Sequence, residues 1–342
     1  MTRPFRVTVQ PGAASFEVQP EESVLDAALR QGVPLAHECT FGGCGTCRVA
    51  LLEGQVRYDE WPLALSDGEA AAGFALMCQA RACSDLVIDA EPRPAGAAEP
   101  VHTRAVVRAV TPVTDSVIHL ELELPDLPAL QYVPGQHLNI LLGDGVHRSF
   151  SMASAPAGHR VDLHVRRIPG GHFTDGVLPQ LQPGAVLEVE LPLGRFHCRT
   201  QDYRPLLMVA TGTGIAPIKS MLEALLDDPD CPPVWLYWGM RDERDLYLDE
   251  LLRSWQGRLY EFSYVPVLSR AGSGWTGRRG HVQQAVLEDL PDLSEHGIYL
   301  CGSPAMIAEA KQAFVQHGAD PRHLHADGFS FQQADHTSVA IA

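Results

Sequence analysis

The sequence predicts a multidomain protein that combines a small α+β unit, an antiparallel β-barrel and a doubly wound α/β unit with a parallel sheet. Its 342 residues exceed the length of one ordinary domain. Residues 92–100 are rich in Pro, Ala and Gly and lack periodicity, which is typical of a linker. Beyond them, closely spaced strands give way near residue 201 to alternating strands and helices. We therefore expect domains at 1–91, 102–200 and 201–330, a linker at 92–101 and a C-terminal tail at 331–342.

The composition places the chain among acidic globular proteins. Hydrophobic residues make up 45% of the sequence and charged residues 20%, so sizeable cores can be buried. A net charge of −16 argues against binding to nucleic acid or anionic lipid through a basic surface. The uncharged run at 206–218 is too short to span a membrane, and no apolar signal segment is visible. We expect a cytoplasmic protein without membrane insertion, whose positive charge is almost all arginine because Lys219 and Lys311 are its only lysines.

The first unit begins with two runs of alternating apolar and polar residues, at 5–9 and 15–19, which predict a β-hairpin around Pro11 and Gly12. Ser23 is expected to cap a short helix that ends at Gly32. A cysteine-rich loop and a further strand at 48–52 follow.

Four of the eight cysteines form a pattern of Cys-x4-Cys-x2-Cys followed by one distant cysteine, which is the plant-type [2Fe–2S] spacing. The loop between them contains Gly42, Gly43 and Gly45, which let the backbone wrap closely and turn its N–H groups toward the sulfurs. A structural zinc site is the alternative, but zinc sites generally use two paired ligand motifs and the last cysteine has no such mate. The predicted ligands are Cys39, Cys44, Cys47 and Cys78.

The second unit contains short strand-like runs separated by turn signals, as in a small antiparallel barrel. These runs lie at 103–110, 116–124, 137–142, 147–153, 160–166 and 186–190.

Three motifs in this unit fit a flavin. An arginine can neutralise a cofactor phosphate, an aromatic ring can stack on the isoalloxazine, and a hydroxyl can bond to flavin N5. A Gly-Gly turn followed by a threonine can hold a pyrophosphate. Each motif alone is common on surface strands, but their order indicates an FAD site. The residues are Arg148, Phe150 and Ser151, then Gly170, Gly171 and Thr174, and finally Pro192, Gly194 and Phe196 at the expected end of the barrel.

The third unit opens with an apolar strand at 206–210 and a turn that is typical of nucleotide binding. Gly212, Thr213 and Gly214 form the turn, whose glycines permit close approach of a phosphate to a helix N-terminus. Pro217 stands where the ordinary dinucleotide fingerprint has its third glycine, and we expect it to open the following helix. The pattern therefore predicts a variant pyrophosphate loop.

A second candidate position lies at 301–302, at the end of another predicted parallel strand, where open α/β sheets place their ligands. Cys301 there can touch a nicotinamide, or it can be an inert core thiol. Ser303 and Pro304 then begin the last helix.

These residues, in this order, resemble the ferredoxin–NAD(P)+ reductase superfamily, and specifically flavoprotein reductases with an N-terminal plant-type ferredoxin domain. Such a protein has a β-grasp ferredoxin, an FAD-binding barrel and an NAD-binding α/β domain. The segments at 237–240, 275–277, 286–293 and 301–306 are most similar to the CDP-6-deoxy-Δ3,4-glucoseen reductases. In that family, electrons pass from NADH through FAD and [2Fe–2S] to a pyridoxamine-phosphate-dependent sugar dehydrase.

The resemblance implies a role for each matching residue. The residues of the first two flavin motifs contact FAD, and Ser151 lies near the reacting part of the flavin. The residues of the turn at 212–217 bind the pyridine nucleotide. Cys301 and Gly302 lie beside the nicotinamide, and Phe329 matches an aromatic position near the flavin. Ser269 and Arg270 would permit NADPH, since a 2′-phosphate needs such donors, but the habit of the family favours NADH.

Three functions remain open at this point. The first is a reductase for a sugar dehydrase, the second is the reductase component of an aromatic oxygenase, and the third is a non-enzymatic redox sensor. An acidic ferredoxin surface suits docking on a basic patch of an electron acceptor, although the same charge can simply solubilise the protein. We also expect the linker to let the ferredoxin move between flavin and acceptor.

Overall fold

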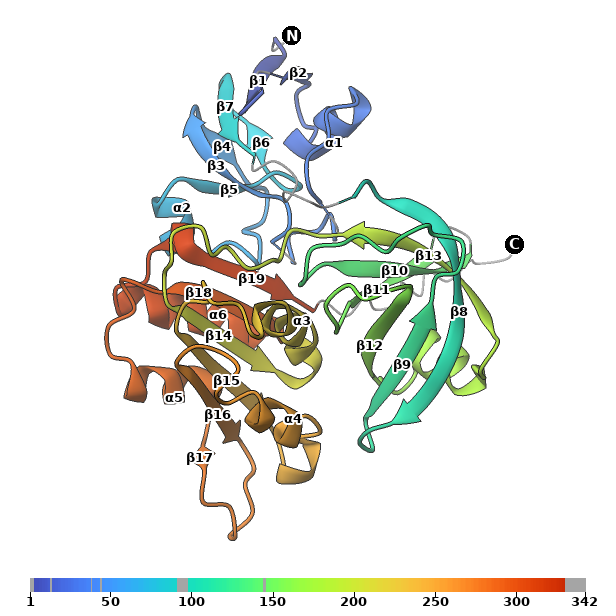
Figure 1. The fold of residues 1–342 in the computed structure, drawn as a ribbon. Helices are drawn as coiled ribbons and strands as arrows, with labels where there is room; N and C mark the ends of the chain where they lie inside the picture. The colour runs from blue at the N-terminus through green and yellow to red at the C-terminus, as the bar shows by residue number, and fades with distance from the viewer. Residues whose placement is uncertain are drawn as a thin grey trace, which may run out of the picture.

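The computed structural model describes residues 3–12, 14–37, 39–43, 45–90, 98–143 and 146–329, which form three units built around three main sheets (Figure 1). The predicted fold class is confirmed: a mixed sheet with short helices is followed by an antiparallel sheet and then by a parallel one. Cys44, most of the predicted linker and the tail at 331–342 lie outside the described residues.

The first unit is a five-stranded mixed sheet of order β2-β1-β7-β3-β5, with a two-stranded sheet of β4 and β6 beside it. Ser23 caps α1 by accepting a hydrogen bond from the N–H of Asp26, as predicted. Ser66 and Glu69 form a capping box at the start of α2. The elements are β1 (Phe5–Gln10), β2 (Ala14–Val18), α1 (Val24–Arg30), β3 (Arg48–Glu53), β4 (Val56–Arg57), α2 (Asp67–Ala71), β5 (Phe74–Leu76), β6 (Arg81–Ala82) and β7 (Leu86–Asp89).

The second unit is a six-stranded antiparallel sheet of order β11-β10-β13-β8-β9-β12. Alternate residues of its strands, such as Leu120 and Leu122, point into one apolar core. The strands are β8 (Val101–Pro112), β9 (Val117–Glu123), β10 (His137–Gly143), β11 (Val146–Ser151), β12 (Arg160–Arg166) and β13 (Val186–Leu193), and a short helical segment spans His172–Val177.

The third unit is a six-stranded parallel sheet of order β17-β16-β15-β14-β18-β19 with helices on both faces. The strand order reverses between β14 and β18, and such a switch point is where open α/β sheets bind ligands. The elements are β14 (Leu206–Thr211), α3 (Ile215–Leu225), β15 (Val234–Met240), α4 (Asp249–Ser254), β16 (Phe262–Leu268), β17 (Arg278–Arg279), α5 (Val282–Asp289), β18 (Gly297–Gly302), α6 (Pro304–Gln316) and β19 (Leu324–Gly328).

The alternation of side chains along β14 divides the core of this unit into two layers. Met208 and Ala210 pack with α3 and α4 on one face, while Leu207 and Val209 pack with α5 and α6 on the other. One prediction is corrected here, because α3 begins at Ile215 rather than at Pro217. The proline fits inside the first turn, where backbone N–H groups have no partner within the helix.

The helices of the described segments give no candidate for a membrane span, because none combines the length and apolar character that a crossing requires.

Candidate redox site

A cleft of about 450 Å³ lies between the antiparallel and parallel sheets, at the carboxyl ends of β14, β15 and β18. Most of its wall belongs to the α/β unit, and the barrel supplies the remainder. The lining from the α/β unit includes Thr211, Gly212, Thr213, Gly302 and Ser303, and the lining from the barrel includes Ser116, Val117 and Arg166. The structure therefore brings the two predicted nucleotide loops together on one cleft.

Two glycines allow these loops to interlock. A Cβ atom on Gly302 would lie 2.1 Å from the hydroxyl oxygen of Thr211, and the φ of Gly302 is +146°. A Cβ atom on Gly214 would lie 2.3 Å from the carbonyl oxygen of Cys301. The Nε1–H of Trp238 donates to the carbonyl of Gly212 at 3.0 Å, and this hydrogen bond fixes the turn to β15. The glycines are thus needed for contact between the loops as well as for approach of a phosphate.

The side chain of Cys301 faces the core rather than the cleft. It is fully buried and belongs to the same apolar cluster as Met208 and Tyr299. Burial raises the pKa of the Cys301 thiol well above its usual value, so the thiol stays protonated and uncharged. Cys301 therefore meets Gly214 through its backbone.

The first two of the three predicted flavin motifs lie side by side. Phe150, on β11, and Phe173, in the helical segment after the Gly-Gly turn, have ring centroids 5.2 Å apart. Ser151 ends β11 and is buried. Thr174 accepts a hydrogen bond from the N–H of Ile168 and donates one to its carbonyl, both at 3.1 Å.

Gly171 makes the approach of Thr174 possible, because a Cβ atom on Gly171 would lie 2.5 Å from the Thr174 hydroxyl. Gly170 adopts a φ of +73° in the same turn. Arg148 donates to the carbonyl of His147 on the strand that carries Phe150.

Three residues of α3 hold the segment that follows β11 against the α/β unit beside the cleft. None of the three was predicted from the sequence. Lys219 Nζ donates to the carbonyl of Ala153 at 2.9 Å and pairs with Glu223 at 2.5 Å. Glu223 accepts from the N–H of Ala155, and Ser220 donates to the carbonyl of Ser154. The segment that follows Ser151 is therefore fixed to the helix that follows the glycine turn. The available signal was the rarity of lysine in this sequence.

The far end of the cleft contains donors suited to a ribose or its phosphate. Ser269 lines the cleft, as do Arg241 and Asp245. Arg270 follows Ser269, and its N–H donates to the carbonyl of Arg241 at 2.9 Å. Sequence reasoning missed Arg241, although its position directly after β15 could have indicated it.

The described cysteines among the predicted cluster ligands lie on the loop before β3 (Cys39 and Cys47) and just after β5 (Cys78). The N–H of Gly43 donates to Cys39 Sγ at 3.2 Å, and the N–H of Cys78 donates to Cys47 Sγ at 3.5 Å. The hydrogen bond with Cys47 holds the pKa of the Cys78 thiol below its usual value although burial opposes this. Backbone donors on sulfur and a lowered thiol pKa both favour thiolates.

Within the described residues, no group of three or more His, Cys, Asp or Glu side chains forms a compact metal site, and the fourth predicted ligand, Cys44, lies outside them.

The cysteine loop lies close to the edge of the parallel sheet beside the cleft. A Cβ atom on Gly328, at the end of β19, would lie 3.5 Å from the carbonyl oxygen of Gly43. The next residue, Phe329, lines the cleft, and its N–H donates to the carbonyl of Gly302 at 3.0 Å. Gly328 and Phe329, at the end of β19, therefore lie between the cysteine loop and the cleft.

Three family models match consecutive parts of the chain. Residues 7–83 match the 2Fe-2S iron-sulfur cluster binding domain, residues 104–198 the oxidoreductase FAD-binding domain, and residues 208–312 the oxidoreductase NAD-binding domain. The CDP-6-deoxy-L-threo-D-glycero-4-hexulose-3-dehydrase reductase of Yersinia pseudotuberculosis is 35% identical over 331 residues, which cover 95% of this chain and 98% of that relative. The chain belongs to the ferredoxin–NAD(P)+ reductase superfamily.

Other similar members of this superfamily serve different systems. Terephthalate 1,2-dioxygenase reductase component 1 of Comamonas sp is 34% identical over 321 residues, with 92% of this chain and 94% of that relative covered. The crystal structure of the Amycolatopsis cytochrome P450 reductase GcoB matches with a TM-score of 0.71 at 32% identity and covers 95% of this chain and 98% of that one.

This reductase therefore contains a [2Fe–2S] domain, an FAD domain and an NAD-binding domain, and it is an NAD(P)H-dependent oxidoreductase. The predicted family and cofactors are confirmed. The residues present fit these groups: the cleft spans the FAD and NAD-binding domains, and backbone N–H groups point at the cysteine sulfurs.

Proposed function

We propose that this reductase takes electrons from NADH and delivers them to a pyridoxamine-phosphate-dependent sugar dehydrase. The observation that carries the electron path is the closeness of the cysteine loop to Gly328, beside the cleft that Phe329 lines. The dehydrase as acceptor is supported by the relative named a hexulose-3-dehydrase reductase, which this chain resembles over almost its full length.

When bound, FAD accepts a hydride and releases electrons singly, and a [2Fe–2S] cluster carries one electron at a time. The chain's own residues bind and orient these groups. Cys39, Cys44, Cys47 and Cys78 hold the cluster. The residues that hold the flavin are Arg148, Phe150, Ser151, Gly170, Gly171, Thr174 and Phe329, and those that hold the pyridine nucleotide are Gly212, Thr213, Gly214, Pro217, Ser269, Arg270, Cys301 and Gly302. Cys301 contributes through its backbone, since its thiol is buried.

A second acceptor class has support of its own. Reductase components of terephthalate 1,2-dioxygenase and phenol 2-monooxygenase are each 34% identical to this chain over more than nine-tenths of its length. The aromatic oxygenase therefore remains the alternative partner. A non-enzymatic redox sensor is set aside, because the chain is an NAD(P)H-dependent oxidoreductase.

An anaerobic titration with NADH tests the electron path. Flavin bleaching and the electron paramagnetic resonance signal of the reduced cluster are followed together. We expect about three electrons per chain, two on the flavin and one on the cluster. Flavin reduction without a cluster signal would contradict the path.

Reconstitution distinguishes the two acceptors. The NADH-reduced protein is mixed either with a pyridoxamine-phosphate-loaded sugar dehydrase and its 4-keto-6-deoxy sugar nucleotide, or with an aromatic-ring oxygenase and its substrate. Product formation with the dehydrase alone supports the proposal, and product with the oxygenase alone supports the alternative.

Arg241 should decide how much NADPH the protein accepts. Arg241 and Ser269 both line the cleft, and the guanidinium of Arg241 can supply a charged donor to a 2′-phosphate bound there. We expect Arg241→Ala to lower kcat/KM for NADPH by roughly tenfold, the effect of losing one charge-assisted hydrogen bond, and to leave NADH turnover nearly unchanged. Steady-state kinetics with both nucleotides measure this. Arg244→Ala, an exposed arginine of the same turn, is the control. An equal loss with NADH and NADPH would contradict this role.

A further inference from the structure

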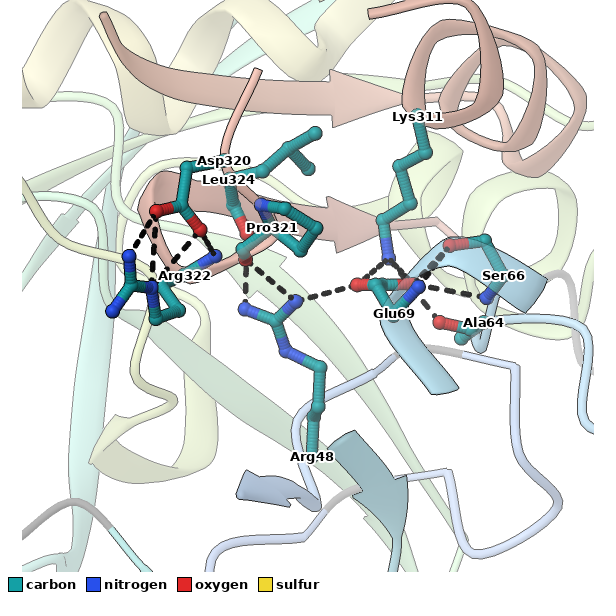
Figure 2. A network of polar contacts seen from close by, with 9 residues as sticks. All are labelled: Arg48, Ala64, Ser66, Glu69, Lys311, Asp320, Pro321, Arg322 and Leu324. Carbon is teal, nitrogen blue, oxygen red and sulfur yellow. Dashed lines mark hydrogen bonds and ion pairs between the residues drawn. The ribbon is translucent and has the colours of Figure 1, made fainter. Parts of the chain in front are cut away.

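A buried ion pair joins the ferredoxin domain to the NAD-binding domain. Lys311, on α6, places its Nζ 2.9 and 3.2 Å from the two carboxylate oxygens of Glu69, on α2 (Figure 2). The side chain of Lys311 is 6% exposed and that of Glu69 is 1% exposed. A buried charge without a partner of opposite sign is strongly destabilising. The ion pair therefore determines which surface of the ferredoxin domain packs against α6.

Arg48 makes a second connection across the same interface. Its Nη1 lies 2.5 Å from Glu69 Oε1, and its Nη2 donates to the carbonyl of Leu324 at 2.9 Å. Its guanidinium also lies over the ring of Phe74, 4.6 Å from the centroid. Arg48 begins β3 and directly follows Cys47, a predicted cluster ligand. Its side chain therefore connects the position next to that ligand with Leu324, the first residue of β19.

The contact extends to the cysteine loop itself. Lys311 Nζ donates to the carbonyl of Ala64 at 3.2 Å, and the N–H of Ala64 donates to the carbonyl of Gly42 at 2.9 Å. The neighbouring Gly43 is the residue that lies close to Gly328 beside the cleft. The interface that holds the two domains together therefore also sets where the cysteine loop lies relative to the cleft. In Figure 1, α2 of the ferredoxin domain lies beside the NAD-binding domain at the edge that holds β19.

Each partner of the pair counteracts the effect of burial on the pKa of the other. Burial alone would raise the pKa of Glu69, but Lys311 and Arg48 outweigh it and hold that pKa below its usual value. Burial lowers the pKa of Lys311, and Glu69 opposes this. The only other lysine, Lys219, is likewise buried between two domains, where it joins α3 to the barrel.

We propose that Glu69, Lys311 and Arg48 are positioning residues that dock the ferredoxin domain for electron transfer from flavin to cluster. Opening this contact slows that internal transfer without changing the reduction of the flavin by NADH. The inference rests on the proposed function, which supplies the electron path.

The rate at which Lys311 is acetylated reports how often the docked interface opens. This measurement does not depend on enzyme turnover. Full-length holoenzyme is treated with a limiting amount of acetic anhydride, and the peptides that contain Lys311 and Lys219 are quantified by mass spectrometry. In Glu69→Gln, Lys311 loses its buried counter-charge, so the interface opens more often. We expect Lys311 to be modified roughly tenfold faster or more in this variant, with Lys219 unchanged as the internal reference.

Stopped-flow absorption measures the effect on electron flow in the same samples. We expect the flavin of Glu69→Gln to be reduced by NADH at the wild-type rate, while cluster reduction slows by roughly tenfold or more. Lys311→Met keeps the capping box of α2 and gives a second variant, in which we expect the same slowing and a larger radius of gyration in small-angle scattering.

Arg322→Gln is the matched control. Its ion pair with Asp320, at 2.6 Å, lies next to the interface but within one domain, and its side chain is 75% exposed (Figure 2). It should change neither Lys311 labelling nor cluster reduction. Faster labelling of Lys311 with unchanged cluster reduction would overturn the proposal, as would full protection of Lys311 in Glu69→Gln. A wild-type protein that labels as expected but delivers no electrons to any partner would count against the proposed function alone.

Discussion

Replacing Cys78 with serine should stop electron delivery to cytochrome c while NADH oxidation by dichlorophenolindophenol continues. Cys78 is buried directly after β5, and its N–H already donates to Cys47 Sγ. Cys78 is one of the four proposed cluster ligands, and a serine hydroxyl does not supply the thiolate that iron requires. The dye takes electrons from the flavin, so it reports the FAD and NAD-binding domains alone. Parallel assays with the two acceptors, together with the paramagnetic signal, measure the separation.

Cys83→Ser is the matched control for this experiment. Cys83 lies only five residues further along, but it is exposed, and its Sγ donates to the carbonyl of Arg81 at 3.9 Å. We expect this variant to retain both activities and the cluster signal. If Cys83→Ser lost the signal and Cys78→Ser kept it, the fourth ligand would be assigned wrongly.

The elements that depend on local patterns were predictable from the sequence. The hairpin of β1 and β2 follows from alternation, and the caps at Ser23 and Ser303 follow from the residues that precede apolar helices. β19 was not predicted as a strand, although it follows β18 through the single helix α6. It is a short edge strand, and its five residues include His325, Asp327 and Gly328 rather than a run of apolar or β-branched residues.

Candidate residues of the site could be named from the sequence where chemistry requires a particular residue type. Glycine turns led to the loops at Gly212 and Gly302, which the structure places on one cleft, and cysteine spacing led to the proposed cluster ligands. Lys219 and Lys311 were noticed only as rare residues, because their roles arise when separately folded domains meet. Cys301 could have been placed better, since it alternates with Leu300 and shares the face of Tyr299, which lies in the core.

Replacing Gly302 with alanine should nearly abolish the use of NADH. The added Cβ would lie 2.1 Å from Thr211 Oγ1, and the φ of +146° is one that residues other than glycine rarely adopt. Backbone strain of this kind costs about 1–3 kcal/mol before the clash is counted. Relief of the clash requires the loops after β14 and β18 to move apart, and both loops line the cleft. We expect kcat/KM for NADH to fall by roughly 100-fold, since each tenfold corresponds to about 1.4 kcal/mol.

The loss must be separated from general unfolding. FAD content and Tm of Gly302→Ala should stay close to wild type, because the barrel is a different unit and the strand β18 remains in place. Gly272→Ala is the control in the same domain, since a Cβ there meets no atom within 4 Å and its φ is not positive. Electrons supplied by dithionite should still reach the cluster in Gly302→Ala, because the cysteine loop lies close to Gly328, whereas the atoms nearest to a Cβ on Gly302 belong to Thr211. Wild-type NADH kinetics in this variant would show that the nicotinamide binds elsewhere, and the cleft between the two sheets would then lose its assignment.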